Sequence, residues 1–209
     1  MKIFVQGIST EVGKTWASAI VVQALGSGYY KPVQSGYPTD SDTRDVKNWV
    51  THPAVRVHEP GITLQEPLSP HAAARLEDLE IKLADIAFPQ DDLLVCEAAG
   101  GLLVPLNDEE LLVDLINKDN KVILVSRHYL GSINHTLLSL DYLKLRDIKT
   151  AVLFMGEENA DTESVIAAHA LNAGYQILGR IPHFAQMNAT IVAQQAEQLR
   201  PALERFLHE

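Results

Sequence analysis

Short runs of consecutive apolar residues alternate along this chain with segments whose apolar residues recur at helical spacing. Runs without polar alternation are typical of strands that are buried on both faces of a parallel sheet. Predicted strands lie at residues 2–6, 29–33, 93–96, 121–125, 150–154 and 176–178. Predicted helices follow the first strand and lie near Val46 and at residues 71–76, 79–86, 109–117, 132–145, 161–172 and 189–206. This order predicts an α/β fold with helices on both faces of a parallel sheet.

The stretch from residue 53 to residue 70 contains four prolines and a glycine, and no periodic pattern. It resembles an excursion near an active site more than a linker between domains. The sequence shows no internal repeat. At 209 residues, we expect residues 1–209 to form one domain.

A glycine-rich turn comes directly after the first predicted strand. Residues 7–15 read Gly-Ile-Ser-Thr-Glu-Val-Gly-Lys-Thr, and a helical pattern begins immediately after them. Backbone N–H groups at such a turn can cradle phosphate, while Lys14 can reach a β- or γ-phosphate and the Thr15 hydroxyl can bind Mg²⁺. Five residues rather than the usual four separate Gly7 from Gly13. The alternative is a strand-to-helix turn that binds nothing. The sequence favours a P-loop NTPase-like sheet.

Ligands of parallel sheets bind beyond the carboxyl ends of the strands, so the residues that follow the other strands are candidates for the same site. Lys31 follows the second strand, and a solvent-exposed lysine is its alternative interpretation. Glu97 ends an apolar strand, where its carboxylate can hold Mg²⁺ or can be merely exposed. Gly131 and Ser132 open a helix that either binds an anion or is an ordinary capped helix.

Net charge, apolar content and cysteine count limit the kinds of partner and compartment that we expect for this protein. The net charge of −10 argues against a general nucleic-acid surface, and no apolar run reaches the length of a membrane span. Cys96 is the single cysteine, which favours a reducing compartment. The chain starts with a predicted strand rather than a signal peptide. These features predict a cytoplasmic enzyme without nucleic-acid or membrane partners.

Taken together, these segments resemble the dethiobiotin synthetase family, in the family's order and over nearly the whole chain. The longer phosphate loop is itself a feature of that family. The residues that carry the resemblance are 10–15 (Thr-Glu-Val-Gly-Lys-Thr), 31–36 (Lys-Pro-Val-Gln-Ser-Gly), 41–42 (Ser-Asp), 66–71 (Glu-Pro-Leu-Ser-Pro-His), 97–101 (Glu-Ala-Ala-Gly-Gly), 130–135 (Leu-Gly-Ser-Ile-Asn-His) and 179–182 (Gly-Arg-Ile-Pro).

The resemblance implies an ATP- and Mg²⁺-dependent ring closure of 7,8-diaminononanoate with CO₂. A substrate amine becomes a carbamate, the carbamate takes the γ-phosphoryl group, and the second amine closes the ring and expels phosphate. It also implies roles: catalysis by Lys14, Lys31 and Thr10, and Mg²⁺ binding by Thr15, Asp42 and Glu97. Implied nucleotide contacts are Glu11, Val12, Gly13, Lys14, Thr15, Trp16, Asp42, Glu97, Ala98, Ala99, Gly100, Pro182, His183 and Phe184.

The family is a homodimer, which implies a substrate site near the interface between two copies. Thr10 and Ser35 are implied to contact the substrate amine or carbamate. The substrate carboxylate is implied to lie at the start of a helix from the partner, at Leu130, Gly131, Ser132, Ile133 and Asn134.

Three departures from the family pattern bear on function. Ala98 stands where the family has glycine, so it is strained if that position needs a positive φ. Asp40 and Asp45 are alternatives to Asp42 as the metal ligand. Met155 and Gly156 replace an asparagine whose amide reads the adenine edge, which predicts weak discrimination between nucleobases unless Asn159 or backbone groups near His183 take over.

Two other functions fit parts of the sequence. A partitioning-type ATPase has the same broad fold, but it carries a signature lysine where this chain has Ser9. A non-catalytic nucleotide-sensing domain is the second alternative. The retained Lys14, Lys31, Asp42 and Glu97 argue against it.

Overall fold

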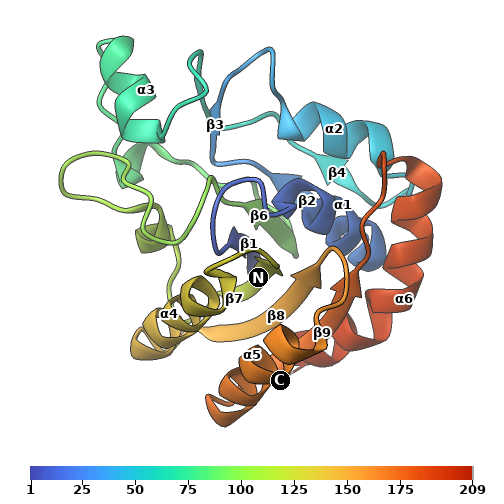
Figure 1. Cartoon of the computed structure of the whole chain (residues 1–209). Coiled ribbons are helices and arrows are strands. Elements are labelled where there is room, and N and C mark those ends of the chain that lie inside the picture. The colour runs from blue at the N-terminus through green and yellow to red at the C-terminus, as the bar shows by residue number, and fades with distance from the viewer. Residues whose placement is uncertain (209) are drawn as a thin grey trace.

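The computed structural model describes residues 1–208. Within these residues, seven parallel strands form the main sheet, in the spatial order β4-β2-β6-β1-β7-β8-β9 (Figure 1). The strands are β1 (Lys2–Gly7), β2 (Gly28–Tyr30), β4 (Arg56–Val57), β6 (Leu94–Glu97), β7 (Lys121–Arg127), β8 (Lys149–Met155) and β9 (Gln176–Ile181).

Helices cover both faces of this sheet. On one face α1 (Lys14–Leu25) packs against α6 (Ala189–His208) and α2 (Asp42–Trp49), and on the other α4 (Ser132–Leu145) packs against α5 (Ala160–Asn172) (Figure 1). The predicted α/β architecture is therefore confirmed. Because both faces are covered, the central strands consist almost entirely of buried apolar residues.

The second predicted strand, residues 29–33, is wrong as a single element. Strand β2 ends at Tyr30, and Val33–Ser35 forms β3, which pairs with β5 (Ile62–Leu64) in a separate two-stranded parallel sheet. Pro32 lies between the two strands and has no N–H to donate to a ladder, so the chain leaves the main sheet here. Strands β4 and β5 also lie in the stretch that was expected to be irregular.

Two predicted helices, at 79–86 and 109–117, are also wrong. They are reduced to single 3₁₀ turns at η1 (Leu83–Asp85) and η2 (Leu112–Leu115). In each turn an aspartate side chain, Asp85 or Asp114, accepts a hydrogen bond from the backbone N–H three residues before it. The N–H of Leu112 donates to the carbonyl of Val104 at 2.8 Å, so this backbone is tied to a neighbouring segment rather than to a helix.

Helix α2 begins at Asp42 and not near Val46, which corrects the predicted loop at residues 37–45. Ser41 caps the helix, because its Oγ accepts a hydrogen bond from the N–H of Arg44 at 3.2 Å. Asp42 is therefore held in the first helical turn. Helix α3 (Pro70–Leu76) and the remaining helices lie within a few residues of their predicted positions. Among residues 1–208, no helix is long and apolar enough to cross a membrane.

Candidate active site

The phosphate-binding loop joins β1 to α1 and has the left-handed backbone that its glycines permit. Gly13 has a φ of 93°, and a Cβ at this position would lie 2.8 Å from Met155 Cγ, so both backbone conformation and space require glycine. Glu11 is also left-handed, with a φ of 54°. Lys14 donates from Nζ to the Ser9 carbonyl at 3.0 Å. Burial, and then the nearby Lys31 charge, lower the pKa of Lys14 to about 8.

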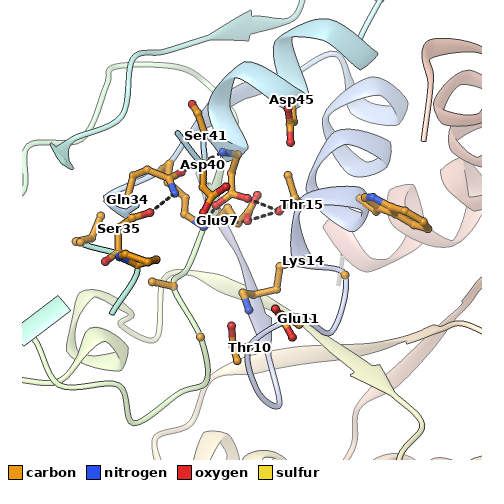
Figure 2. Close-up of a pocket in the computed structure, with 18 of the residues that line it drawn as sticks. Thr10, Glu11, Lys14, Thr15, Gln34, Ser35, Asp40, Ser41, Asp45 and Glu97 are labelled. Carbon is orange, nitrogen blue, oxygen red and sulfur yellow. Dashed lines mark hydrogen bonds and ion pairs between the residues drawn. The ribbon is translucent and has the colours of Figure 1, made fainter. Parts of the chain in front are cut away.

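Thr15 connects this loop to two carboxylates that lie far apart in the sequence. Its Oγ1 is 2.6 Å from Asp42 Oδ1 and 3.0 Å from Glu97 Oε1 (Figure 2). A hydroxyl has only one proton, so it cannot donate fully to both. Glu97 is 1% exposed and also accepts a hydrogen bond from the Tyr29 hydroxyl at 2.9 Å. The three oxygen-bearing side chains of Thr15, Asp42 and Glu97 thus meet at one point.

Lys31 lies against the same two carboxylates. Its Nζ is 2.7 Å from Asp42 Oδ2 and 2.9 Å from Glu97 Oε1, and the residue is 3% exposed. Burial alone would lower the pKa of Lys31, but the charges of Glu97 and Asp42 raise it above its ordinary value. Lys31 is therefore a buried, charged ammonium group. Its alternative interpretation as a solvent-exposed lysine is wrong.

Of the three aspartates near the start of α2, Asp42 is the one that contacts Thr15. Burial would raise the pKa of Asp42, but the Lys31 charge and hydrogen bonds from Lys31 and Thr15 lower it. Gln34 holds it further, because Gln34 Oε1 accepts a hydrogen bond from the Asp42 N–H at 3.1 Å. Asp40 and Asp45 line the same cavity without contacting Thr15.

The oxygens at this point fit Mg²⁺ better than a softer metal. Among residues 1–208, no group of three or more histidine, cysteine or acidic side chains is placed to form an all-protein metal site. Mg²⁺ does not need one, because it is usually bound by one or two carboxylates together with substrate phosphates and water. Thr15, Asp42 and Glu97 supply that donor set beside the phosphate loop.

A cavity of about 960 Å³ opens beside the loop at the carboxyl ends of the strands. Figure 2 shows Thr10, Glu11 and Lys14 on the loop, with Gln34 and Ser35 coming from β3. Predicted site residues that line the cavity are Thr10, Glu11, Gly13, Lys14, Thr15, Trp16, Lys31, Ser35, Asp42, Glu97, Ala99, Gly100, His183 and Phe184.

The cavity wall near β8 and β9 is aromatic and apolar. The ring centroids of Trp16 and His183 are 6.4 Å apart, as are those of Trp16 and Phe184. Met155 lies at the end of β8 and packs against Gly13. Asn159 was one alternative for reading the base, and its Oδ1 is used elsewhere: it caps α5 by accepting a hydrogen bond from the Thr162 N–H at 3.0 Å.

Some predicted site residues lie away from the cavity lining. Val12 and Ala98 are buried in the core, and Pro182 is exposed just before the aromatic wall. Ala98 is not strained, because the described non-glycine residues with positive φ are Glu11, Asp78 and Asp147. Within one chain, the segment Leu130, Gly131, Ser132, Ile133 and Asn134 does not line the cavity.

Several cavity residues were not predicted from the sequence, among them Arg127, Arg44 and Trp49. Arg127 ends β7, and its Nη1 donates to the carbonyl of left-handed Glu11 at 3.1 Å. A charged residue directly after an apolar strand was the available signal, because β7 ends at the same edge as the phosphate loop.

Comparison with known proteins shows the family to which this chain belongs. A family described as "AAA domain" matches residues 1–190. The "ATP-dependent dethiobiotin synthetase BioD" of Christiangramia forsetii is 44% identical over 202 residues, which cover 96% of each chain. The protein of the same name from Cytophaga hutchinsonii is 41% identical over 203 residues, covering 95% of this chain and 96% of that one.

A solved structure of a plasmid partition protein from Borrelia burgdorferi matches this chain with a TM-score of 0.57 at 13% sequence identity. The match covers 100% of this chain and 98% of that protein's chain. At that identity it supports the fold alone. The family match and the two relatives together identify this chain as a member of the ATP-dependent dethiobiotin synthetase family.

Proposed function

We propose that this protein closes the ureido ring of dethiobiotin from 7,8-diaminononanoate, CO₂ and ATP. The observation that carries the proposal is the buried Lys31 ammonium, held between Asp42 and Glu97 directly beside the phosphate loop. A buried charge of this kind is costly unless it is paired, and the pairing here leaves it aimed at a cavity that holds phosphate-binding groups. That arrangement suits the transfer of a phosphoryl group to a second anion.

The reaction proceeds in three steps. One substrate amine adds to CO₂ and loses a proton, which gives a carbamate. A carbamate oxygen then attacks the γ-phosphorus and ADP leaves, which gives a carbamic–phosphoric anhydride. The second amine attacks the anhydride carbon, phosphate leaves with the bonding electrons, and loss of the amine proton completes the ring.

The residues of the chain match the charge that these steps develop. Lys14 and Lys31 both line the cavity beside the phosphate loop, where their positive charges would lower the energy of a transition state with added negative charge. Thr10 and Ser35 line the same part of the cavity and can donate hydrogen bonds to the carbamate or amine. Arg127 holds the loop at Glu11 and adds a further positive charge at its edge.

Mg²⁺ would be held by Thr15, Asp42 and Glu97, and when bound it would neutralise charge on the β- and γ-phosphates. Lys31 contacts both carboxylates, so it also orients them for the cation. Glu11, the backbone of residues 13–16 and residues 98–100 would hold the phosphates, and residues 182–184 would flank the base.

We also propose that the chain acts as one domain, residues 1–209, in a homodimer in the cytoplasm. The start of α4 supports the dimer, because Leu130 is fully exposed and residues 130–134 do not line the active-site cavity of their own chain. Helix N-termini attract anions, so this segment of one chain can bind the substrate carboxylate beside the phosphate loop of its partner.

A partitioning-type ATPase is not favoured, since the position of its signature lysine is Ser9, whose carbonyl accepts a hydrogen bond from Lys14. A nucleotide sensor would not need Lys31 buried at a phosphate site. The test is ATP turnover with and without diaminononanoate and bicarbonate. The proposal predicts ADP formation only when both are added. Equal turnover without them would contradict it.

A further inference from the structure

The phosphate loop divides the cavity into two chemically different ends. Lys31 and Glu97 come from the ends of β2 and β6, on one side of β1 in the sheet. Met155 ends β8, while His183 and Phe184 follow β9, on the other side of β1. A nucleotide whose γ-phosphate meets the charged end must therefore direct its sugar and base toward the β8 and β9 end.

Trp16 belongs to this second end although it follows Thr15 directly. Successive helical residues point about 100° apart, so Thr15 faces the carboxylates while Trp16 faces the β9–α6 connection. The planes of Trp16 and His183 are inclined by 30°, and those of Trp16 and Phe184 by 49°. All three rings line the cavity, and none of the three residues is fully buried.

We propose that this aromatic surface, formed by Trp16, His183 and Phe184, binds the nucleobase by stacking on its face. The size of the base, rather than the hydrogen-bonding pattern of its edge, then sets the order of nucleotide affinity. The inference rests on the proposed use of ATP and adds the residues that hold the base.

At the end of β8, few groups can read the edge of a base. The side chain of Met155 has no hydrogen-bond donor, and Gly156 has no side chain. The backbone N–H of Gly156 is already donated to the carbonyl of Ile181 at 2.8 Å. The side-chain amide oxygen of Asn159 is used in the cap of α5. Stacking needs none of these groups, because every base has a π-face.

Two expected results distinguish stacking on the face of the base from hydrogen bonding to its edge. Adenine and guanine have the same two-ring face and should bind within a few-fold of each other, while cytosine and uracil, with one ring, should bind more weakly. Loss of the Trp16 ring should weaken ATP binding by about tenfold or more, on the scale of base–aromatic stacking in single-stranded nucleic acids.

The experiment compares ATP, GTP, CTP, UTP and inorganic tripolyphosphate by titration calorimetry with Mg²⁺. Trp16→Leu removes the aromatic face but keeps apolar bulk, Trp16→Phe keeps a ring, and Phe184→Leu tests the second ring. Tyr142→Leu, at a ring on α4 that does not line the cavity, is the matched control. A Trp49→Phe protein leaves Trp16 as the single tryptophan. Because Trp49 also lines the cavity, the ATP affinity of this protein is first compared with wild type, and Trp16 fluorescence then reports on the base.

We expect Trp16→Leu to raise the Kd of ATP and GTP by about tenfold or more, with a smaller rise for CTP and UTP. Tripolyphosphate affinity should change less than about twofold, Trp16→Phe should stay near wild type, and ATP but not tripolyphosphate should quench Trp16 fluorescence. Equal weakening of ATP and tripolyphosphate would overturn the inference, since Trp16 would then support the loop. Unchanged ATP affinity would also overturn it.

The two proposals fail differently. Normal, ring-dependent ATP binding without dethiobiotin formation would overturn the proposed function and leave the stacking surface standing. Absence of both ATP and tripolyphosphate binding in the wild-type protein would overturn both.

Discussion

At the charged end of the cavity, Lys31 and Glu97 are 3% and 1% exposed. Contacts of 2.6–3.0 Å made by Lys31 and Thr15 join Asp42 and Glu97. At the aromatic end, Trp16 and Phe184 are only half-buried, His183 is exposed, and ring packing rather than hydrogen bonding joins them. The side chains of the charged end hold one another by ion pairs and hydrogen bonds, while those of the proposed base-binding end are held by ring packing. Chemistry that needs exact charge placement is thus separated from the recognition of the base.

The largest effect should follow from removing the ammonium at the charged end. Lys31→Ala and Lys31→Gln should each lower kcat by at least about a hundredfold, the scale of a lost oxyanion donor. The thermal midpoint should also fall, because breaking a buried ion pair by removing one partner costs about 3–5 kcal/mol. Single-turnover kinetics and thermal melting measure both. Lys47→Ala, on the exposed side of α2, is the control, and near-normal kcat in either Lys31 variant would remove Lys31 from the mechanism.

Asp42→Asn tests whether the contact with Thr15 marks a metal ligand. The amide keeps the shape but loses the charge, so the Mg²⁺ concentration for half-maximal rate should rise by at least about tenfold, as for groups that support a bound metal. Asp45→Asn is a matched control, since Asp45 lies in the same helix and cavity without reaching Thr15. Equal Mg²⁺ dependence in the two variants would refute the assignment of Asp42.

A diamine substrate without the carboxylate tests the shared site. If residues 130–134 of the partner bind that group, its loss should raise KM by about tenfold, the equivalent of one charge-assisted hydrogen bond. Leu130→Asp should raise KM for the normal substrate in the same direction, by repulsion. Sedimentation velocity would check the assembly at the same time, and a fully active monomer would rule out the shared-site arrangement.

The smallest effect concerns the base. Met155 and Gly156 offer no paired donor and acceptor, so kcat/KM for GTP, CTP and UTP should stay within about tenfold to a hundredfold of ATP. Met155→Asn should widen the preference for ATP. The comparison needs all four nucleotides at one Mg²⁺ concentration. A preference for ATP above about a thousandfold would mean that another group reads the adenine edge.

Local patterns were enough to predict much of this structure. Apolar runs predicted every strand of the main sheet except β4, with β2 only in part. The Gly13-Lys14-Thr15 turn predicted the phosphate loop, because both signals depend on residues close in the sequence. Helix α4 lies at its predicted residues 132–145. The wrong predictions depend on distant partners instead. Residues 109–117 have a helical pattern, but backbone hydrogen bonds to residues 104–106 replace the helix, and only a 3₁₀ turn remains at Leu112–Leu115.

At the charged site, too, local sequence signals identify candidate residues, while contacts between distant residues decide their role. From its position alone, Lys31 is as compatible with solvent as with an active site. Its burial follows from Asp42, 11 residues later, and Glu97, 66 residues later, which only the folded sheet brings together. The contact of Arg127 with the Glu11 carbonyl joins residues 116 positions apart, which only the fold brings together.

Product analysis by mass spectrometry tests the central claim most directly. The protein would be incubated with diaminononanoate, ¹³C-bicarbonate, Mg²⁺ and ATP. The account predicts dethiobiotin carrying one ¹³C atom, with one ADP and one phosphate formed for each product molecule. Well-folded protein that binds ATP but forms no labelled dethiobiotin, with any of the four nucleotides, would contradict it.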